Sequence, residues 1–376
     1  MASQARQKEQ PHFVLVPLMA QGHMIPMIDI ARLFAEPGVI VSLVTTPYKA
    51  SRFESCISRA RDQSGLPISI VKISFSCQEV GLPMGSESLD TLLSRNLLRK
   101  FFKALSMLQE PLEKYLEDQK LQPWCIISDK ALSWTSKLKQ LRSSIFQGLF
   151  SMESKSFGVV VNSFNALELG CAEELEKVFD KKVWCIGLVS LCYKSYSEKF
   201  SRGNKSSIDE SQCLQWLESM QPRSVIYVCL GSLCRLVPST DRAWTRLRSL
   251  RKTLYLVEER FKERITGRGL LIKGWAPQVL ILSSPVIGGF LTHCGWNSSI
   301  EGACSESWSV GEERWGEEGN TFGGEEGEKR RKRATEIGEK GRRAMEQGGS
   351  SHSSMSYLIQ DVRQLYEATR NKGQKL

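Results

Sequence analysis

The 376-residue sequence predicts an α/β protein with parallel sheets and two domains. Short apolar runs of strand length recur along the chain, and a Gly-containing turn and apolar positions at helical spacing follow the first of them. A polar stretch near the middle separates two sets of these elements. A single core stops growing at roughly 250–300 residues, so a chain of this length is expected to build two.

The first expected element is the strand His12–Pro17, which precedes a Gly-containing turn and a helical pattern. Val39–Thr45 is the next strand. Together they make a right-handed βαβ unit, the building block of a parallel sheet. The later candidates are mostly apolar on both faces, as a covered parallel sheet requires. They are Cys125–Ser128, Gly158–Val161, Val183–Ile186, Ser224–Leu230, Leu270–Lys273 and Val286–Leu291.

The domain boundary is expected near residue 200, because Tyr193–Glu210 is rich in Ser, Lys, Asn and Gly. This gives an N-terminal domain, 1–200, and a C-terminal domain, 201–376. Other stretches break the βα alternation. Lys137–Phe150 and Thr240–Lys252 are basic without a clear period, and residues 305–327 are Glu- and Gly-rich, typical of loop or disorder, before a last helix from about Lys329.

Charge and composition argue against several classes of protein. The net charge is +10, but Lys and Arg are scattered, and the densest run, Lys329–Arg333, follows acidic residues as on a solvated helix face. We therefore expect no nucleic-acid partner. The polar start lacks a secretory apolar core, no run of about 18 apolar residues occurs, and neither CxxC pairs nor clustered histidines appear. A cytoplasmic chain without a membrane span or metal is expected.

The most specific pattern is residues 275–302, WAPQVLILSSPVIGGFLTHCGWNSSIEG. A strand would end near Leu291, a tight turn would follow, and a helix would begin at Trp296. The N–H groups at such a helix end face the turn and bind phosphate, and Gly295 lets a ligand approach the backbone closely. Further donors for a diphosphate occur at the same turn. They are His293, Asn297 and Ser298.

This string closely resembles the donor-binding box of plant UDP-glycosyltransferases. The resemblance implies that Trp275 stacks on uracil, Ala276 offers its backbone to the base, Gln278 lies near the ribose, and Glu301 accepts from ribose hydroxyls. A buried Trp, a core His and a helix-capping Asn would explain each residue singly, but not the whole string. The UDP-sugar-binding set is Ser232, Trp275, Ala276, Gln278, His293, Trp296, Asn297, Ser298 and Glu301.

Three further segments resemble the same family. PLMAQGHMIP places His23 after the first strand, where α/β sheets bind ligands, and CIISDK places Asp129 after a later strand. The resemblance makes His23 the base that deprotonates an acceptor hydroxyl and Asp129 the carboxylate that orients it, roles that suit imidazole and carboxylate chemistry. SVIYVCLGSLCRL puts Gly231 and Ser232 at a strand end, resembling a turn that touches the diphosphate; an ordinary capped turn is nearly as good an interpretation.

Family members are longer than this chain, and the missing material falls at the stretches that break the pattern. The N-terminal domain is shortened after about residue 136, and the C-terminal domain around 240–256 and after 304. The last loss removes the Asp/Glu-Gln pair that holds the sugar in the family. The resemblance thus implies two Rossmann-like domains facing across a cleft, the GT-B fold, with an incomplete C-terminal domain.

The implied activity is inverting transfer of a sugar, with glucose expected, from a UDP-sugar to a hydroxyl of a small lipophilic acceptor such as a flavonoid or terpenoid. The UDP-sugar is a co-substrate, no cofactor is needed, and a monomer is expected. The alternative is a non-catalytic remnant that binds UDP or a lipophile. A nicotinamide-dependent oxidoreductase would need a GxGxxG turn, which the chain lacks, and a nucleic-acid binder would need a localised basic face.

Overall fold

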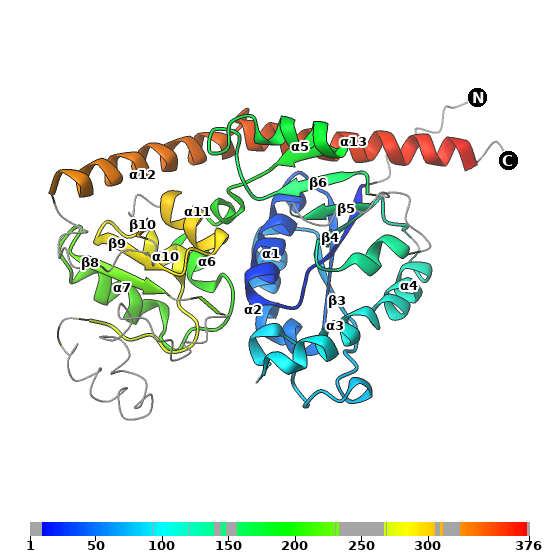
Figure 1. Ribbon diagram of the computed structural model, residues 1–376, viewed down its shortest axis with the longest axis horizontal. Helices are drawn as coiled ribbons and strands as arrows, with labels where there is room; N and C mark the ends of the chain where they lie inside the picture. The colour runs from blue at the N-terminus through cyan, green and yellow to red at the C-terminus, as the bar shows by residue number, and fades with distance from the viewer. Residues whose placement is uncertain are drawn as a thin grey trace. The chain divides into compact units, whose positions relative to one another are not determined.

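The computed structural model divides into two compact units. Unit 1 comprises Met1–Lys194 and Lys340–Leu376, and unit 2 comprises Ser195–Glu339. Figure 1 shows their helices and strands, coloured along the chain. The structure describes residues 10–92, 94–119, 121–138, 144–147, 156–229, 231–232, 267, 269–304, 309–310 and 324–373.

Unit 1 is built on a seven-stranded sheet in the order β3-β2-β1-β4-β5-β6-β7. All of its strand pairs are parallel. The chain leaves β1 for β2 on one side and later returns to β4 on the other, so the crevice at the carboxyl ends of β1 and β4 is the place where such sheets bind ligands. The strands are β1 (His12–Val16), β2 (Ile40–Thr45), β3 (Ile68–Lys72), β4 (Cys125–Asp129), β5 (Ser144–Gln147), β6 (Gly158–Val161) and β7 (Lys182–Cys185).

In unit 1, α-helices follow β1, β2, β3 and β6, as a βα repeat requires (Figure 1). Thr46 caps one of them by accepting from the backbone of Lys49, with Pro47 at the first helical position and Gly65 in the left-handed region after its end. The helices are α1 (Gln21–Ala35), α2 (Pro47–Ser64), α3 (Leu98–Ser106), α4 (Gln109–Glu117) and α5 (Cys171–Phe179), and the single 3₁₀ turns are Gln78–Val80, Leu89–Thr91, Arg95–Leu97, Ser133–Lys137 and Val189–Cys192.

The core of unit 1 surrounds its central strands. β1 and β4 are buried at every residue, because helices cover both faces of a doubly wound sheet. Phe13 of β1 meets Phe34 of α1 edge to face, with ring centroids 5.2 Å apart. The expected strands at both positions are therefore confirmed.

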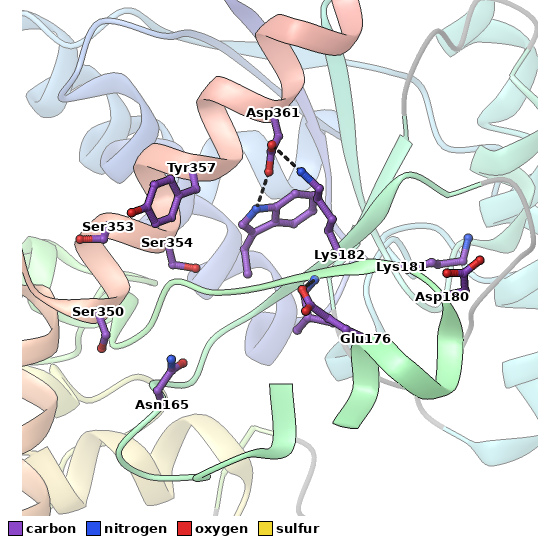
Figure 2. A pocket seen from close by; sticks show the side chains of 12 residues that line it. Asn165, Glu176, Asp180, Lys181, Lys182, Ser350, Ser353, Ser354, Tyr357 and Asp361 are labelled. Atoms are coloured by element: carbon purple, nitrogen blue, oxygen red, sulfur yellow. Dashed lines mark hydrogen bonds and ion pairs between the residues drawn. The ribbon is translucent and has the colours of Figure 1, made fainter. Parts of the chain in front are cut away.

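The C-terminal segment packs on unit 1. α12 (Gly324–Met345) is followed by α13 (Ser350–Gly373), whose Asp361 accepts from Lys182 Nζ at 2.5 Å and from Trp184 Nε1 at 3.2 Å (Figure 2). Tyr366 of α13 also stacks on Trp124, with ring centroids 4.6 Å apart. The sequence analysis places residues 340–376 in the second domain, whereas these contacts join them to the sheet of the first.

Unit 2 carries a parallel sheet whose described strands run in the order β10-β9-β8. Its core joins Cys213 and Leu217 to Leu280, Ile281 and neighbouring apolar side chains. Asp209 and Gln212 form a capping box that starts one of the helices. The elements are α6 (Tyr196–Ser201), α7 (Glu210–Glu218), β8 (Val225–Cys229), α10 (Gln278–Leu282), β9 (Ile287–Thr292), α11 (Trp296–Cys304) and β10 (Ser309–Val310).

Five segments differ from the sequence-based expectation. Leu270–Lys273 is irregular, because no neighbouring strand pairs with it in the described structure. β3 and β5 were not expected, and β10 lies in the stretch that reads as loop. The final helix begins at Gly324 rather than near Lys329 and is interrupted before Ser350. Residues 240–256, 305–308 and 311–323 lie outside the described residues.

Candidate active site

Unit 1 brings His23 and Asp129 into direct contact. Nδ1 of His23 lies 2.6 Å from Oδ2 of Asp129. His23 is the third residue of α1, after the end of β1, and Asp129 is the last residue of the neighbouring strand β4. The His23 side chain is 35% exposed and that of Asp129 only 3%, so a ligand in solution can reach the ring but not the carboxylate.

The environment of Asp129 determines what the imidazole can do. Oδ1 of Asp129 accepts from the backbone N–H of Ala131 at 2.9 Å, which fixes the carboxylate, while Oδ2 faces His23. A carboxylate at Nδ1 favours the tautomer that carries the proton there and stabilises the imidazolium ion. Nε2 is then the nitrogen that can take a proton from a substrate.

The turn that carries His23 is tied to a separate loop. The carbonyl oxygen of Met19 accepts from the backbone N–H of Leu89 at 2.9 Å and from the hydroxyl of Ser88 at 3.0 Å. Ser88 is fully buried, and its hydroxyl also contacts Asp90. These bonds hold the turn between β1 and α1, so they restrict where the His23 ring can lie.

A buried charge cluster supports that loop. Asp90 pairs with Lys49 Nζ and with Arg52 Nη1, both at 3.0 Å. Burial opposes ionisation of the Asp90 carboxyl, but attraction to Lys49 and hydrogen bonds from Ser88, Lys49 and Arg52 outweigh it and hold its pKa below the ordinary value. Burial also lowers the pKa of Lys49, against the attraction of Asp90. The sequence analysis did not identify this cluster.

In unit 2, the turn between β9 and α11 holds His293 beside two glycines. A Cβ built on Gly231 would lie 2.4 Å from Cε1 of His293, and one built on Gly295 would lie 2.4 Å from its Nε2. Gly231 also has φ +77°, which a larger residue rarely adopts. The segment containing Gly231 and Ser232 therefore adjoins the His293 turn, although 62 residues separate Gly231 from His293 in the sequence.

The N-terminus of α11 can receive an anion. Ser299 donates the first helical bond that the structure records, to Gly295 at 3.0 Å. The backbone N–H groups of the first helical turn precede this bond and point toward the turn after β9, as at the N-terminus of any α-helix. Such a helix end carries partial positive charge and suits phosphate oxygens.

Four predicted nucleotide-binding residues form one network. Gln278 Nε2 donates to Glu301 Oε2 at 2.8 Å and lies 3.3 Å from Ser298 Oγ. Trp275 joins them through Arg202, because its indole N–H donates to the Arg202 carbonyl oxygen at 3.2 Å. Arg202 Nη2 completes the network by donating to Glu301 Oε1 at 2.7 Å. Ala276 is adjacent, and its carbonyl accepts from the Gln278 N–H.

Arg202 is the member of this network that sequence reasoning missed. It follows α6 within the polar stretch that reads as a linker, and 99 residues separate it from Glu301. A buried arginine is unexpected in such a stretch, and no local pattern indicates its partner. The predicted residues thus gather as a His23–Asp129 pair and as a donor group in unit 2, while their roles stay predictions.

Unit 1 also has a polar surface cavity of about 830 Å³ (Figure 2). It lies where β7, the end of α5 and the first turns of α13 meet. Its lining contains none of the residues that the sequence singles out, and two of its polar groups, Lys182 and Trp184, already bond Asp361. Among the described residues, no group of His, Cys, Asp and Glu could hold a metal ion, and no helix is long and apolar enough to cross a membrane.

Comparison with known proteins gives consistent relatives. The family model described as "UDP-glucoronosyl and UDP-glucosyl transferase" matches residues 205–309. UDP-glycosyltransferase 73C4 of Arabidopsis thaliana is 38% identical over 97% of this chain and 99% of its own length. UDP-glycosyltransferase 73C11 of Barbarea vulgaris is 37% identical over 98% and 100%.

These relatives are longer inside the alignment. The alignment with 73C4 spans 493 positions, and this chain has 376 residues, so at least 117 positions (493 − 376) have no residue of this chain opposite them. Coverage of 97% of one chain and 99% of the other shows that these gaps are mostly internal. The expectation of internal deletions is confirmed.

Solved structures give the same fold. Glycyrrhiza uralensis UGT73P12, complexed with glycyrrhetinic acid 3-O-monoglucuronide, matches with a TM-score of 0.79 at 24% identity over 98% of each chain. Arabidopsis thaliana UGT89C1 complexed with UDP matches with a TM-score of 0.74 at 25% identity over 94% of this chain and all of that one. The expected GT-B class, two α/β units with parallel sheets, is confirmed.

Proposed function

The chain belongs to the plant UDP-glycosyltransferase family, of the UGT73 type, and we propose that it transfers a sugar, glucose in the first place, from a UDP-sugar to a hydroxyl of a small lipophilic acceptor. The observation that carries this proposal is the 2.6 Å contact between His23 and Asp129 at the switch point of the unit 1 sheet. A base and its orienting carboxylate are what a hydroxyl nucleophile needs.

The proposed reaction is a single displacement. Nε2 of His23 takes the proton of the acceptor hydroxyl while that oxygen forms a bond to the anomeric carbon. The bond between the anomeric carbon and the β-phosphate oxygen breaks on the opposite face, its electron pair leaves with UDP, and the configuration inverts. Asp129 stabilises the imidazolium that results.

The donor group of unit 2 would stabilise the departing UDP. The N-terminus of α11 and the His293 turn offer N–H donors where negative charge develops on the diphosphate. Trp275 offers a flat face for uracil, and Glu301 offers a carboxylate for the ribose hydroxyls. The transfer requires both groups to act on the same pair of substrates.

The nature of the acceptor is supported by the relatives. One solved relative holds a glycyrrhetinic acid glucuronide and another, UGT89C1, was solved with quercetin; both are lipophilic molecules with hydroxyl groups. UGT89C1 was also solved with UDP-L-rhamnose, so a relative of this chain binds a UDP-sugar other than UDP-glucose. We therefore propose a flavonoid or terpenoid alcohol as acceptor and test the sugar directly.

The test pairs binding with transfer. Purified chain is titrated with UDP by calorimetry and then incubated with UDP-glucose, UDP-glucuronic acid or UDP-rhamnose and a panel of flavonols and terpenoid alcohols, with glycosides detected by mass spectrometry. We expect UDP binding and a glycoside product. UDP binding without product from any pair would favour the non-catalytic remnant, and absence of UDP binding would remove the proposal.

Three further measurements test the remaining parts of the proposal. We propose that the reaction needs no metal or other cofactor, so dialysis against EDTA should leave the rate unchanged. We also propose a cytoplasmic monomer. Size-exclusion chromatography with light scattering measures its mass, and a fluorescent fusion shows its location; a dimer or an organelle signal would correct these points.

A further inference from the structure

Arg202 is a buried cation in a segment whose sequence suggests only a solvated connection. Its side chain is 6% exposed, and that of its partner Glu301 is 5% exposed. Burying an ion pair gains little stability over an apolar pair of similar size, because both ions lose their hydration. We therefore expect the pair to position neighbouring side chains as well as to contribute to stability.

The contacts of Glu301 leave hydrogen-bonding capacity on both of its carboxylate oxygens. Oε1 accepts from Arg202 at 2.7 Å and Oε2 accepts from Gln278 at 2.8 Å. Each carboxylate oxygen has about two lone-pair directions, so each can accept one more hydrogen bond, the number that the two hydroxyls of a ribose supply. Arg202 thus orients the carboxylate without occupying it.

Arg202 also fixes the aromatic face beside that carboxylate. Its carbonyl oxygen accepts from the indole N–H of Trp275 at 3.2 Å. The segment that follows runs along the same turn, since Ser206 bridges Gly274 and Trp275, and Ser207 Oγ accepts from the backbone N–H of Lys273 at 3.1 Å. One residue therefore joins the base platform and the ribose acceptor.

We propose that Arg202 is a positioning residue for nucleoside recognition, holding Glu301 toward the ribose and Trp275 toward the base. This inference rests on the proposed function, because it assumes that UDP binds at these residues. Its consequence is specific. Arg202 should contribute to the discrimination between a ribose and a 2′-deoxyribose, not only to affinity.

The experiment measures the ratio of the dissociation constants for 2′-deoxy-UDP and UDP by calorimetry on the full chain. For the wild type we expect a ratio of roughly 10 or more, the scale for leaving a charged hydrogen-bond acceptor unpaired. Arg202→Ala should reduce the ratio to about 1–3, because a carboxylate without Arg202 no longer faces the ribose. Lys205→Ala, which removes an exposed cation from the same segment, should leave the ratio unchanged.

A double substitution tests whether Arg202 acts through Glu301. Glu301→Ala should itself collapse the ratio, and adding Arg202→Ala to it should cause no further fall. A variant that lost affinity for both nucleotides equally, with the ratio intact, would reduce Arg202 to a structural role and overturn the inference. A further fall of the ratio in the double variant would also overturn it.

A final variant provides the test if Arg202→Ala does not fold. Arg202→Lys keeps the buried charge but loses the planar fork, so we expect a cooperative melt and a ratio between those of the wild type and Glu301→Ala. A ratio equal to the wild type would overturn the inference. If the wild type binds UDP but the Arg202 variants discriminate as it does, only this inference fails; if the wild type binds no UDP, the proposed function fails as well.

Discussion

The His23–Asp129 pair of unit 1 and the donor group of unit 2 rest on very different amounts of described structure. His23 and Asp129 emerge from the centre of a seven-stranded sheet whose strands β1 and β4 are buried at every residue. The donor group of unit 2 rests on three described strands, and one face of β8 exposes Ile226 and Val228 by 50% and 55%. The difference teaches that both sets of polar residues keep their contacts, although among the described residues the strands of unit 2 are less covered than β1 and β4.

The greatest expected effect concerns the better supported half. His23→Ala should lower turnover by roughly 10²–10⁴ and leave UDP affinity nearly unchanged, because proton transfer occurs only in the transition state. Initial rates and UDP titrations measure the two quantities. Asp129→Asn is the companion variant, expected to fall in the same direction. An unchanged rate in His23→Ala would show that His23 is not the base. The comparison between the two residue groups would then contain no catalytic residue in unit 1.

Restoring the missing segment should improve the weaker half. We expect this chain to turn over slowly, because the break after Cys304 removes the pair that holds the sugar in the family. Several hydrogen bonds of about 0.5–1.5 kcal/mol each, and the alignment they impose, are lost. A chain carrying the corresponding segment of the 73C4 relative should react at least about tenfold faster and melt at a higher temperature.

That comparison has a clear contrary outcome. Equal turnover by the natural and restored chains, assayed with UDP-glucose and the same acceptor, would show that other residues hold the sugar. The donor group of unit 2 would then be as complete as the His23–Asp129 pair, and the exposed face of β8 would have no functional cost.

Trp275→Ala should weaken UDP binding by about 1–3 kcal/mol, the usual scale for losing a base–aromatic stack. Calorimetry measures it. Trp275→Phe keeps a stacking face while losing the hydrogen bond to Arg202, so it should retain most of the affinity. Equal losses in both variants would assign the effect to the hydrogen bond and not to stacking.

A matched pair of substitutions compares the two sheets directly. Val14 of β1 is 0% exposed and Val228 of β8 is 55% exposed. Val14→Ala should lower the free energy of unfolding by about 2 kcal/mol, through lost apolar burial and a residual cavity. Val228→Ala should change it by less than about 0.5 kcal/mol, as for an ordinary surface site. Urea denaturation measures both, and a large loss in Val228→Ala would mean that this face is covered in solution.

The elements that could be predicted from the sequence are those whose apolar pattern lies entirely within one short segment. β1, β2, β4 and β9 are short and mainly apolar runs, and the contact between His23 and Asp129 was expected from the resemblance to the family, with each residue placed after a strand. β3 was missed because ISIVK alternates and is half exposed. Leu270–Lys273 failed as a strand because an apolar run needs a partner, which its own residues do not specify.

The donor site was predictable only in its contiguous part. Trp275, Gln278, Ser298 and Glu301 lie within one string, and the resemblance of that string to the family's donor-binding box indicated a common site. Arg202 lies in a polar segment, and its burial depends on a carboxylate 99 residues away. The same holds for Lys49 and Asp90, whose pairing across 41 residues has no signature in either local sequence.

The bond between Asp361 and the side chains of Lys182 and Trp184 has a consequence for synthesis on the ribosome. Trp184 is translated 177 residues before the carboxylate that receives its indole N–H. At about 5–20 residues per second, the edge strand β7 waits roughly 9–35 s for the helix that covers it. Unit 2 is synthesised entirely within that interval, so unit 1 is the last unit to be completed. Until then β7 is an uncovered edge strand, to which a chaperone can bind.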